Sequence, residues 1–89
     1  MLIRINPHTL ERAEERGVTK DEIEDVVRTG TPIPARGNRQ AKEKVFDFRQ
    51  RRQKVYYEQK KVQVIYVLQE GVANTVTVYV FYGKWREQK

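Results

Sequence analysis

The pattern of hydrophobic and polar positions changes once along the chain, from a helical period to a strand period. Up to Gly30 the apolar residues recur three or four positions apart, which is the spacing of one helix face. Beyond residue 44 they form short runs that are rich in β-branched and aromatic residues, which is typical of strands. The sequence therefore predicts two helices followed by four strands. The predicted strands cover residues 45–49, 54–58, 62–68 and 75–82.

The first predicted helix begins at a proline and ends at a glycine. Asn6 is a favourable N-cap, and Pro7 occupies the first helical position, where a backbone N–H would have no helical partner. Leu10 and Ala13 have the spacing of an inward face. Gly17 stands where a left-handed residue would end the helix. These signals predict a helix of about three turns.

The second predicted helix carries a capping box. Thr19 and Glu22 match the S/T-x-x-E pattern, in which each side chain accepts a hydrogen bond from the other residue's backbone N–H. Gly30 and the prolines at 32 and 34 end this helix, because proline does not continue one. We expect the two helices to form a tight pair. The predicted buried stripe of the second helix is Ile23, Val26 and Val27.

The connections between the predicted strands are too short for parallel crossovers, so an antiparallel meander is expected. Residues 2–5 are a candidate edge strand, and residues 35–41 are typical of a basic loop. In the last strand we expect the three alternating valines to face the helices, and the threonines and aromatic residues to face outward. The predicted fold is a single α+β domain over residues 1–89, with an N-terminal helix pair packed on a four-stranded antiparallel sheet.

Composition adds a basic charge and excludes several classes of protein. With 18 Lys and Arg against 12 Asp and Glu, the 89-residue chain has a net charge of +6, which makes nucleic acid the first partner to consider. The absence of cysteine excludes disulfides, thiolate metal sites and cysteine nucleophiles. Neither a signal peptide nor an apolar span is found, so a cytoplasmic protein without membrane contact is expected. No metal-binding or nucleotide-binding motif occurs, and we expect no cofactor.

One set of residues has the chemistry to cleave RNA through its own 2′-hydroxyl, which needs a base, a proton donor and cations for the phosphate. His8 is the only histidine and lies in the first helical turn, where the helix dipole favours the neutral imidazole. Arg12 and Arg16 follow it at i+4 and i+8 as candidate phosphate ligands. Tyr82 and Lys84 are the candidate proton donor and a further phosphate ligand. A histidine that merely packs at a helix start, and an ordinary salt-bridged arginine face, remain open alternatives.

A second set of basic residues has aromatic rings interleaved with it, as nucleic-acid-binding surfaces do. Lysine and arginine side chains contact phosphates, and exposed rings stack on unpaired bases. The alternative is that the rings belong to the core and that the cations only solubilise turns. The candidate nucleic-acid-binding residues are Arg36, Arg39, Lys44, Arg49, Arg51, Arg52, Lys54 and Tyr56.

The first helix resembles the opening of a known family. Residues 8–18, HTLERAEERGV, are similar to the HAxxRMxxRGI motif of domain of unknown function 4258, and residues 75–79 and 83–85 resemble that family's closing strand. Ala13 stands where the motif has methionine, and Thr9 stands where it has alanine. The family is in turn distantly similar to the RelE/ParE and BrnT toxins. The resemblance implies a metal-independent, ribonuclease-like toxin that is neutralised by an antitoxin.

Three functions are open from the sequence. The leading hypothesis is an endoribonuclease toxin of RelE/BrnT type, with His8 as base or acid and with Arg12, Arg16 and Lys84 stabilising the phosphate charge. The second is a module that binds RNA or DNA without cutting it. The third is an interaction domain whose basic face docks an acidic partner. RNA and a small acidic antitoxin are therefore the predicted partners, and homodimerisation stays open.

Overall fold

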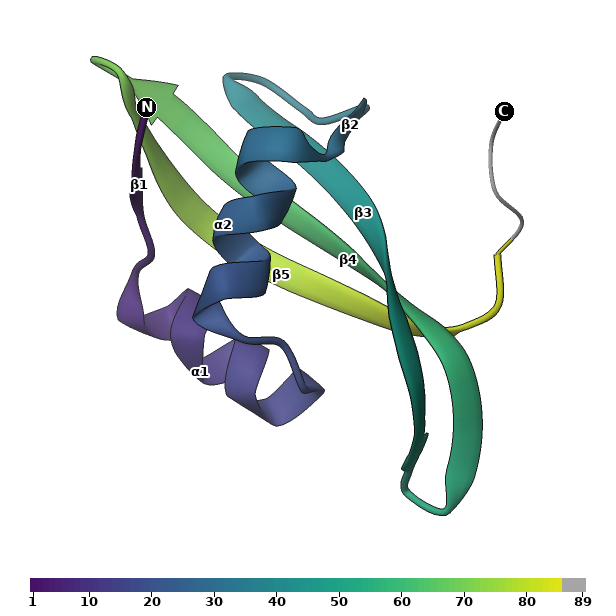
Figure 1. Ribbon diagram of the computed structural model, residues 1–89. Coiled ribbons are helices and arrows are strands. Elements are labelled where there is room, and N and C mark those ends of the chain that lie inside the picture. The colour runs from purple at the N-terminus through teal and green to yellow at the C-terminus, as the bar shows by residue number, and fades with distance from the viewer. Residues whose placement is uncertain (86–89) are drawn as a thin grey trace.

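Two helices pack on one face of a twisted five-stranded sheet (Figure 1). The computed structural model describes residues 1–85. The order of the strands across the sheet is β1-β5-β4-β3-β2. The helices and strands are α1 (Pro7–Arg16), α2 (Lys20–Thr29), β1 (Leu2–Arg4), β2 (Thr31–Ile33), β3 (Arg39–Arg52), β4 (Val55–Gln69) and β5 (Val72–Gly83).

The predicted α+β class is confirmed, but the sheet is mixed and has five strands rather than four antiparallel ones. β1 is the predicted N-terminal edge strand and runs parallel to β5. β2, which pairs with β3, is missing from the prediction because Pro32 and Pro34 signal the end of a helix. Proline is nevertheless tolerated in an edge strand, where its missing N–H need not pair. The predicted loop at 35–41 is also too long, since β3 already begins at Arg39.

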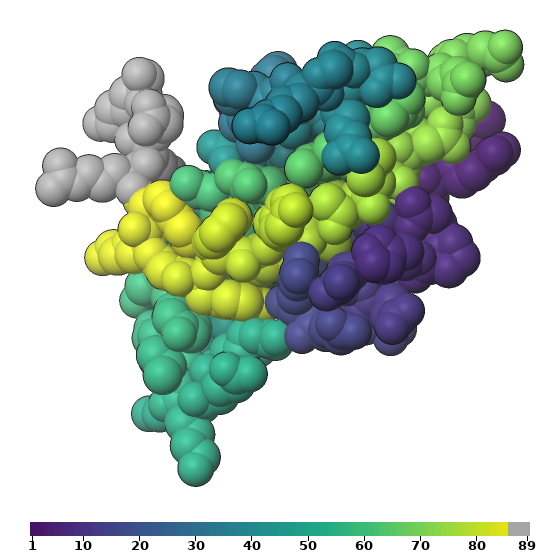
Figure 2. Space-filling view, turned by 180° about the vertical axis from the view of Figure 1, so that it is seen from behind, coloured from purple at the N-terminus to yellow at the C-terminus, as the bar shows by residue number. Residues whose placement is uncertain are grey.

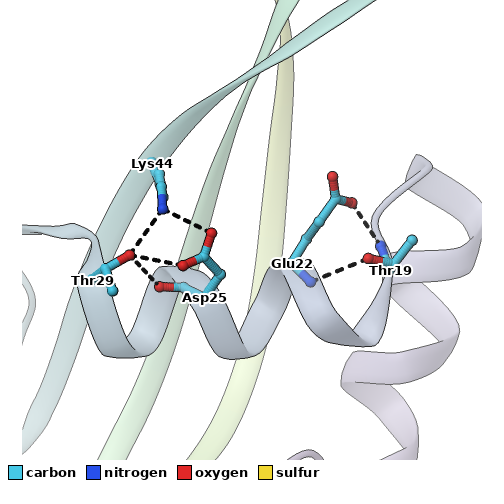
Figure 3. Close-up of polar contacts among 5 residues, drawn as sticks. All are labelled: Thr19, Glu22, Asp25, Thr29 and Lys44. Atoms are coloured by element: carbon cyan, nitrogen blue, oxygen red, sulfur yellow. Dashed lines mark hydrogen bonds and ion pairs between the residues drawn. The ribbon is translucent and has the colours of Figure 1, made fainter.

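Both predicted helix starts are confirmed by their hydrogen bonds. The Asn6 side chain accepts a hydrogen bond of 2.7 Å from the backbone N–H of Thr9. In the capping box, the Glu22 N–H donates to Thr19 Oγ1 at 3.1 Å, and the Thr19 N–H donates to Glu22 Oε1 at 2.9 Å (Figure 3). Gly17 ends α1 with a φ of 80°, which favours glycine. The helix boundaries therefore follow from local chemistry.

The core lies between the two helices and the sheet. The predicted stripe of α2 is confirmed, since all three of its residues are fully buried. The inward face of β4 and β5 is mostly valine, which packs well on a pleated surface. In residues 1–85, no helix is both long enough and apolar enough to cross a membrane. The largest fully buried apolar residues are Ile23, Val26, Val27, Val62, Val64 and Val78.

A β-bulge in β5 changes which residues face the helices. Thr75 and Thr77 pair with consecutive residues of β4, so Val76 is the extra residue. Thr75 is buried against α1, and its hydroxyl donates to Thr9 Oγ1 at 3.0 Å. The predicted outward orientation is therefore wrong for Thr75, because the bulge reverses the alternation. Thr9, rather than the predicted Leu10, is the buried residue in the first turns of α1.

The β3–β4 hairpin continues beyond the end of β5 as a two-stranded arm (Figures 1 and 2). β5 ends with Gly83 opposite Gln59, so residues 48–58, called the arm below, pair only with each other. At its tip Gln53 and Lys54 have φ values of 51° and 70°, which is the geometry of a two-residue hairpin turn. This turn lacks the glycine or asparagine that usually marks a hairpin, so the sequence does not show where the turn lies. The two strands are therefore longer than the predicted ones.

Lys44 joins β3 to the second half of α2 (Figure 3). Its Nζ lies 2.7 Å from Asp25 Oδ2 and 2.9 Å from Thr29 Oγ1. The hydrogen bond from Lys44, followed by that from Thr29, holds the pKa of Asp25 below its ordinary value of 3.8. Lys44 is among the predicted nucleic-acid-binding residues, and the structure pairs its ammonium group with this carboxylate.

We expect Asp25→Asn to lower stability in a pH-dependent way. Because the pKa of Asp25 is lower in the folded than in the unfolded chain, its carboxylate stabilises the fold above the ordinary pKa, and this contribution is lost as the pH falls through the folded pKa. Urea denaturation between about pH 7 and about pH 3 should show the midpoints of the wild type and the variant converging as the pH falls. A constant difference over this range would contradict a stabilising role of the charge.

Candidate nucleic-acid interface

The predicted nucleic-acid-binding residues lie mainly at the two ends of β3 rather than on one surface. Arg36 precedes β3 and Arg39 is its first residue, whereas Arg49, Arg51 and Lys54 belong to the arm at the other end. β3 has 14 residues, so at about 3.3 Å per residue its two ends are roughly 40 Å apart along the strand. The structure therefore divides the basic residues into an arm group and a far-end group.

The arm carries the denser group of charges. Its eleven residues include four cations and, in Glu58, one carboxylate. Arg49, Arg51 and Lys54 are exposed, and Tyr56 is 50% exposed. Arg51 pairs directly with Tyr56 across the ladder, and such neighbours have Cβ atoms about 5 Å apart. A cationic and an aromatic residue are thus neighbours on the arm, and the Arg51 guanidinium also donates to the Lys54 carbonyl oxygen at 3.4 Å.

A second β-bulge lies at the base of the arm. The β3–β4 register shifts between Asp47 and Gln50, and Arg49 has a φ of 48° there. Asp47 Oδ2 lies 3.9 Å from Arg49 Nη2, and both side chains are about 70% exposed. An ion pair this long and this exposed contributes little, because water screens it. The Arg49 charge is therefore accessible to an anion in solution.

The base of the arm is joined to the C-terminal end of α1 through backbone carbonyls. A helix leaves its last carbonyls without helical partners, and cationic or phenolic donors suit the negative end of its dipole. Three side chains of the sheet supply these donors, at 2.5 to 2.8 Å. The contacts are Arg52 to the Glu15 oxygen, Tyr82 to the Arg16 oxygen and Lys60 to the Gly17 oxygen.

Tyr82, the predicted proton donor, lies in the middle of this junction. Its ring centroid is 5.1 Å from that of Phe48 and 5.4 Å from that of Tyr57. The Arg52 guanidinium carbon lies 5.1 Å from the centre of the same ring. Burial raises the pKa of Tyr82, with Arg52 acting to lower it and Glu22 to raise it. In this structure Tyr82 and Arg52 attach the arm to α1.

The stripe of His8, Arg12 and Arg16 does not stay on one face of α1. Positions four apart shift by about 40° around a helix of 3.6 residues per turn. His8 is accordingly exposed, Arg12 is half-buried, and Arg16 reaches the outer edge of β5. There Arg16 Nη1 donates to the Val78 carbonyl oxygen at 2.5 Å. The three side chains therefore point to different environments.

The predicted catalytic residues are not gathered around one point, since three lie along α1 and two lie in or just after β5. His8 precedes Arg16 by eight residues, which is about 12 Å of helix. Tyr82 binds the Arg16 carbonyl at the opposite end of this helix, and Lys84 is exposed just after β5. A base and an acid that act on one phosphodiester must each come within about 3 Å of the oxygen that loses or gains the proton. His8 and Tyr82 do not meet this condition in the structure.

Lys60 also belongs to the junction between the arm and α1, although it is not among the predicted site residues. It is 6% exposed, and its Nζ lies 2.8 Å from Glu22 Oε1 as well as 2.8 Å from the Gly17 oxygen. Its only signal in the sequence is its register, since it stands two positions before the inward-facing Val62. A buried lysine is otherwise hard to distinguish from an exposed one by pattern alone.

Comparisons of the chain with family models, with curated proteins and with solved structures find no match. The similarity to domain of unknown function 4258 and to the RelE/ParE and BrnT toxins thus stays a prediction from the residues of α1 and the closing strand. Within residues 1–85, no three histidine, aspartate or glutamate side chains are grouped as metal ligands would be. The charges and rings that the fold places together are therefore the features that indicate a function.

Proposed function

We propose that the protein binds nucleic acid through the arm. The observation that carries this proposal is the projection of the arm from the body of the sheet, with four cations against one carboxylate and an exposed tyrosine (Figure 2). Phosphate groups supply most of the affinity in complexes of this kind, because neutralising them releases condensed counterions. The cations lie on the β3 strand of the arm and at its tip, so one phosphate backbone that runs along this strand can contact several of them.

Replacing Arg49, Arg51 and Lys54 with glutamine should weaken RNA binding by about 100-fold at about 0.1 M salt. These three residues are exposed, whereas Arg52 is left unchanged because it attaches the arm to α1. Fluorescence anisotropy with a labelled, unstructured RNA of about 20 nucleotides measures the dissociation constant. The thermal midpoint of the variant should match that of the wild type, since exposed side chains contribute little to stability.

The matched control removes three exposed cations from the other end of the molecule. Arg28, Arg36 and Arg39 replaced by glutamine lower the net charge equally but lie outside the arm. This variant should keep its affinity within about threefold of the wild type. Equal losses in the two triple variants would show that binding follows net charge alone, and would contradict the arm as the interface.

The same samples test the ribonuclease hypothesis. RNA that stays intact with the wild type in EDTA supports a binding module. Cleavage that disappears in His8→Ala would instead support the endoribonuclease predicted from α1, with the arm as its RNA-binding element. Absence of RNA affinity in the wild type would refute both and favour the interaction domain for an acidic partner.

A further inference from the structure

The face of the sheet opposite the helices is not covered by any other element of residues 1–85 (Figure 2). Val62 and Val64 of β4 and Val78 of β5 are fully buried on the helix side. Because side chains alternate along a strand, Tyr79 and Phe81 lie on the opposite, uncovered side. In Figure 2 α1 lies beside β5 rather than over it.

Tyr79 and Phe81 form an exposed aromatic pair. They are 42% and 48% exposed, although large apolar side chains are usually buried. One residue separates them, so their Cα atoms are about 6.8 Å apart along the strand. This is twice the spacing of about 3.4 Å between stacked nucleotides of one strand. Each ring therefore has room for one base, provided that the strand is extended and its bases are not stacked on one another.

Each ring of the pair has a cation beside it. Lys61 pairs with Phe81 across the ladder, and its Nζ lies 4.8 Å from the centre of the Trp85 ring. The Arg16 guanidinium carbon lies 5.6 Å from the centre of the Tyr79 ring, held there by the hydrogen bond to the backbone of β5. The carboxylates that share this face belong to β3, on the far side of β4 from the pair. The charges beside the rings therefore favour a polyanion with flat π-faces over an apolar protein surface. The chemistry matches that of a nucleic acid.

The aromatic pair is continuous with the arm. Lys61 follows the last arm residue by three positions on β4, so one strand connects the two surfaces. We propose that the uncovered face is a platform for single-stranded nucleic acid, on which unpaired bases stack on Tyr79 and Phe81 while the backbone passes Lys61 toward the arm. This inference rests on the proposed function, to which it adds the class of ligand. Sheets that present exposed aromatic residues bind unpaired RNA bases in the same physical way.

Replacing both Tyr79 and Phe81 with alanine should weaken binding of a single-stranded RNA by tenfold or more. Since no charge is removed, the slope of log affinity against log salt concentration should stay unchanged, unlike that of the arm variant. The double substitution Tyr79→Phe with Phe81→Tyr keeps both rings and should keep the affinity. Leu68→Ala removes an exposed apolar side chain elsewhere and should have no effect. Thermal midpoints establish that each variant is folded.

The form of the ligand provides the second readout. The wild type should bind the single strand more tightly than a duplex of the same sequence, and the double alanine variant should lose this preference. A matching single-stranded DNA separates recognition of unpaired bases from recognition of the 2′-hydroxyl. Unchanged affinity in the double alanine variant, or equal affinity for duplex and single strand, would overturn the platform. If the platform were overturned but the arm variant still lost affinity, nucleic-acid binding through the arm would stand without the platform.

Discussion

Replacing Gly30 with alanine is expected to lower the free energy of unfolding by roughly 3 kcal/mol. A β-carbon on this residue would lie 2.5 Å from the Val26 carbonyl oxygen and 2.8 Å from that of Glu43. Both oxygens belong to the backbone, so no side chain can move aside. The Val26 oxygen accepts the Gly30 N–H at 2.8 Å, at the C-terminal end of α2. The Glu43 oxygen belongs to β3. The new methyl group would push the end of α2 away from the sheet.

Gly83→Ala is the matched control for this substitution. Gly30 has a φ of −71°, which alanine adopts readily, so the expected loss comes from contact alone. At Gly83 the nearest atom to a β-carbon is in the Trp85 ring, at an ordinary 3.5 Å. Urea denaturation should show a lower midpoint for Gly30→Ala, with Gly83→Ala within about 0.5 kcal/mol of the wild type. Three equal midpoints would contradict the tight contact between α2 and β3.

Replacing Lys60 with methionine should cost about 3 kcal/mol, because it leaves the Glu22 carboxylate without its cation. We expect the lower end of the range for broken buried ion pairs, since the Glu22 side chain is 22% exposed and water reaches it. The Gly17 carbonyl also loses its donor, which loosens the junction between α1 and the arm. Denaturation of the wild type and of Lys60→Met measures the loss.

A double variant separates the charge from the packing. Adding Glu22→Gln to Lys60→Met removes the unpaired carboxylate, while the amide oxygen can still accept the Thr19 N–H of the capping box. The double variant should therefore be more stable than Lys60→Met alone. If it is less stable than the single variant, the loss comes from side-chain packing or from the cap, and the ion pair is not what stabilises this junction.

The helices could be predicted closely from the sequence, whereas the sheet could be predicted only in outline. Asn6 and Thr19 start their helices through hydrogen bonds within three residues, so the signal is local. β2 exists because it pairs with β3, and the bulge at Val76 depends on the register against β4. The turn at Gln53 and Lys54 lacks the residues that usually mark a positive φ. Such features depend on contacts between distant segments.

The candidate site was predictable in its residue types but not in its arrangement. The excess of cations indicated a polyanion, and the alternation of the last strand indicated an outward aromatic face. No pattern showed that β3 places Arg39 and Arg51 at opposite ends, or that Arg52 and Tyr82 bind the end of α1. His8 and Arg16 do have the spacing of one helix face, but over eight residues the rotation of the helix turns their side chains in different directions.

The salt dependence of RNA binding tests the central claim most directly. The plot of log affinity against log salt concentration should be steep for the wild type. The slope should become shallower by about 2 when Arg49, Arg51 and Lys54 are replaced by glutamine, because each lost phosphate contact to a single strand removes about 0.7. Parallel lines for the two proteins would contradict the account, since they would show that the arm neutralises no phosphates.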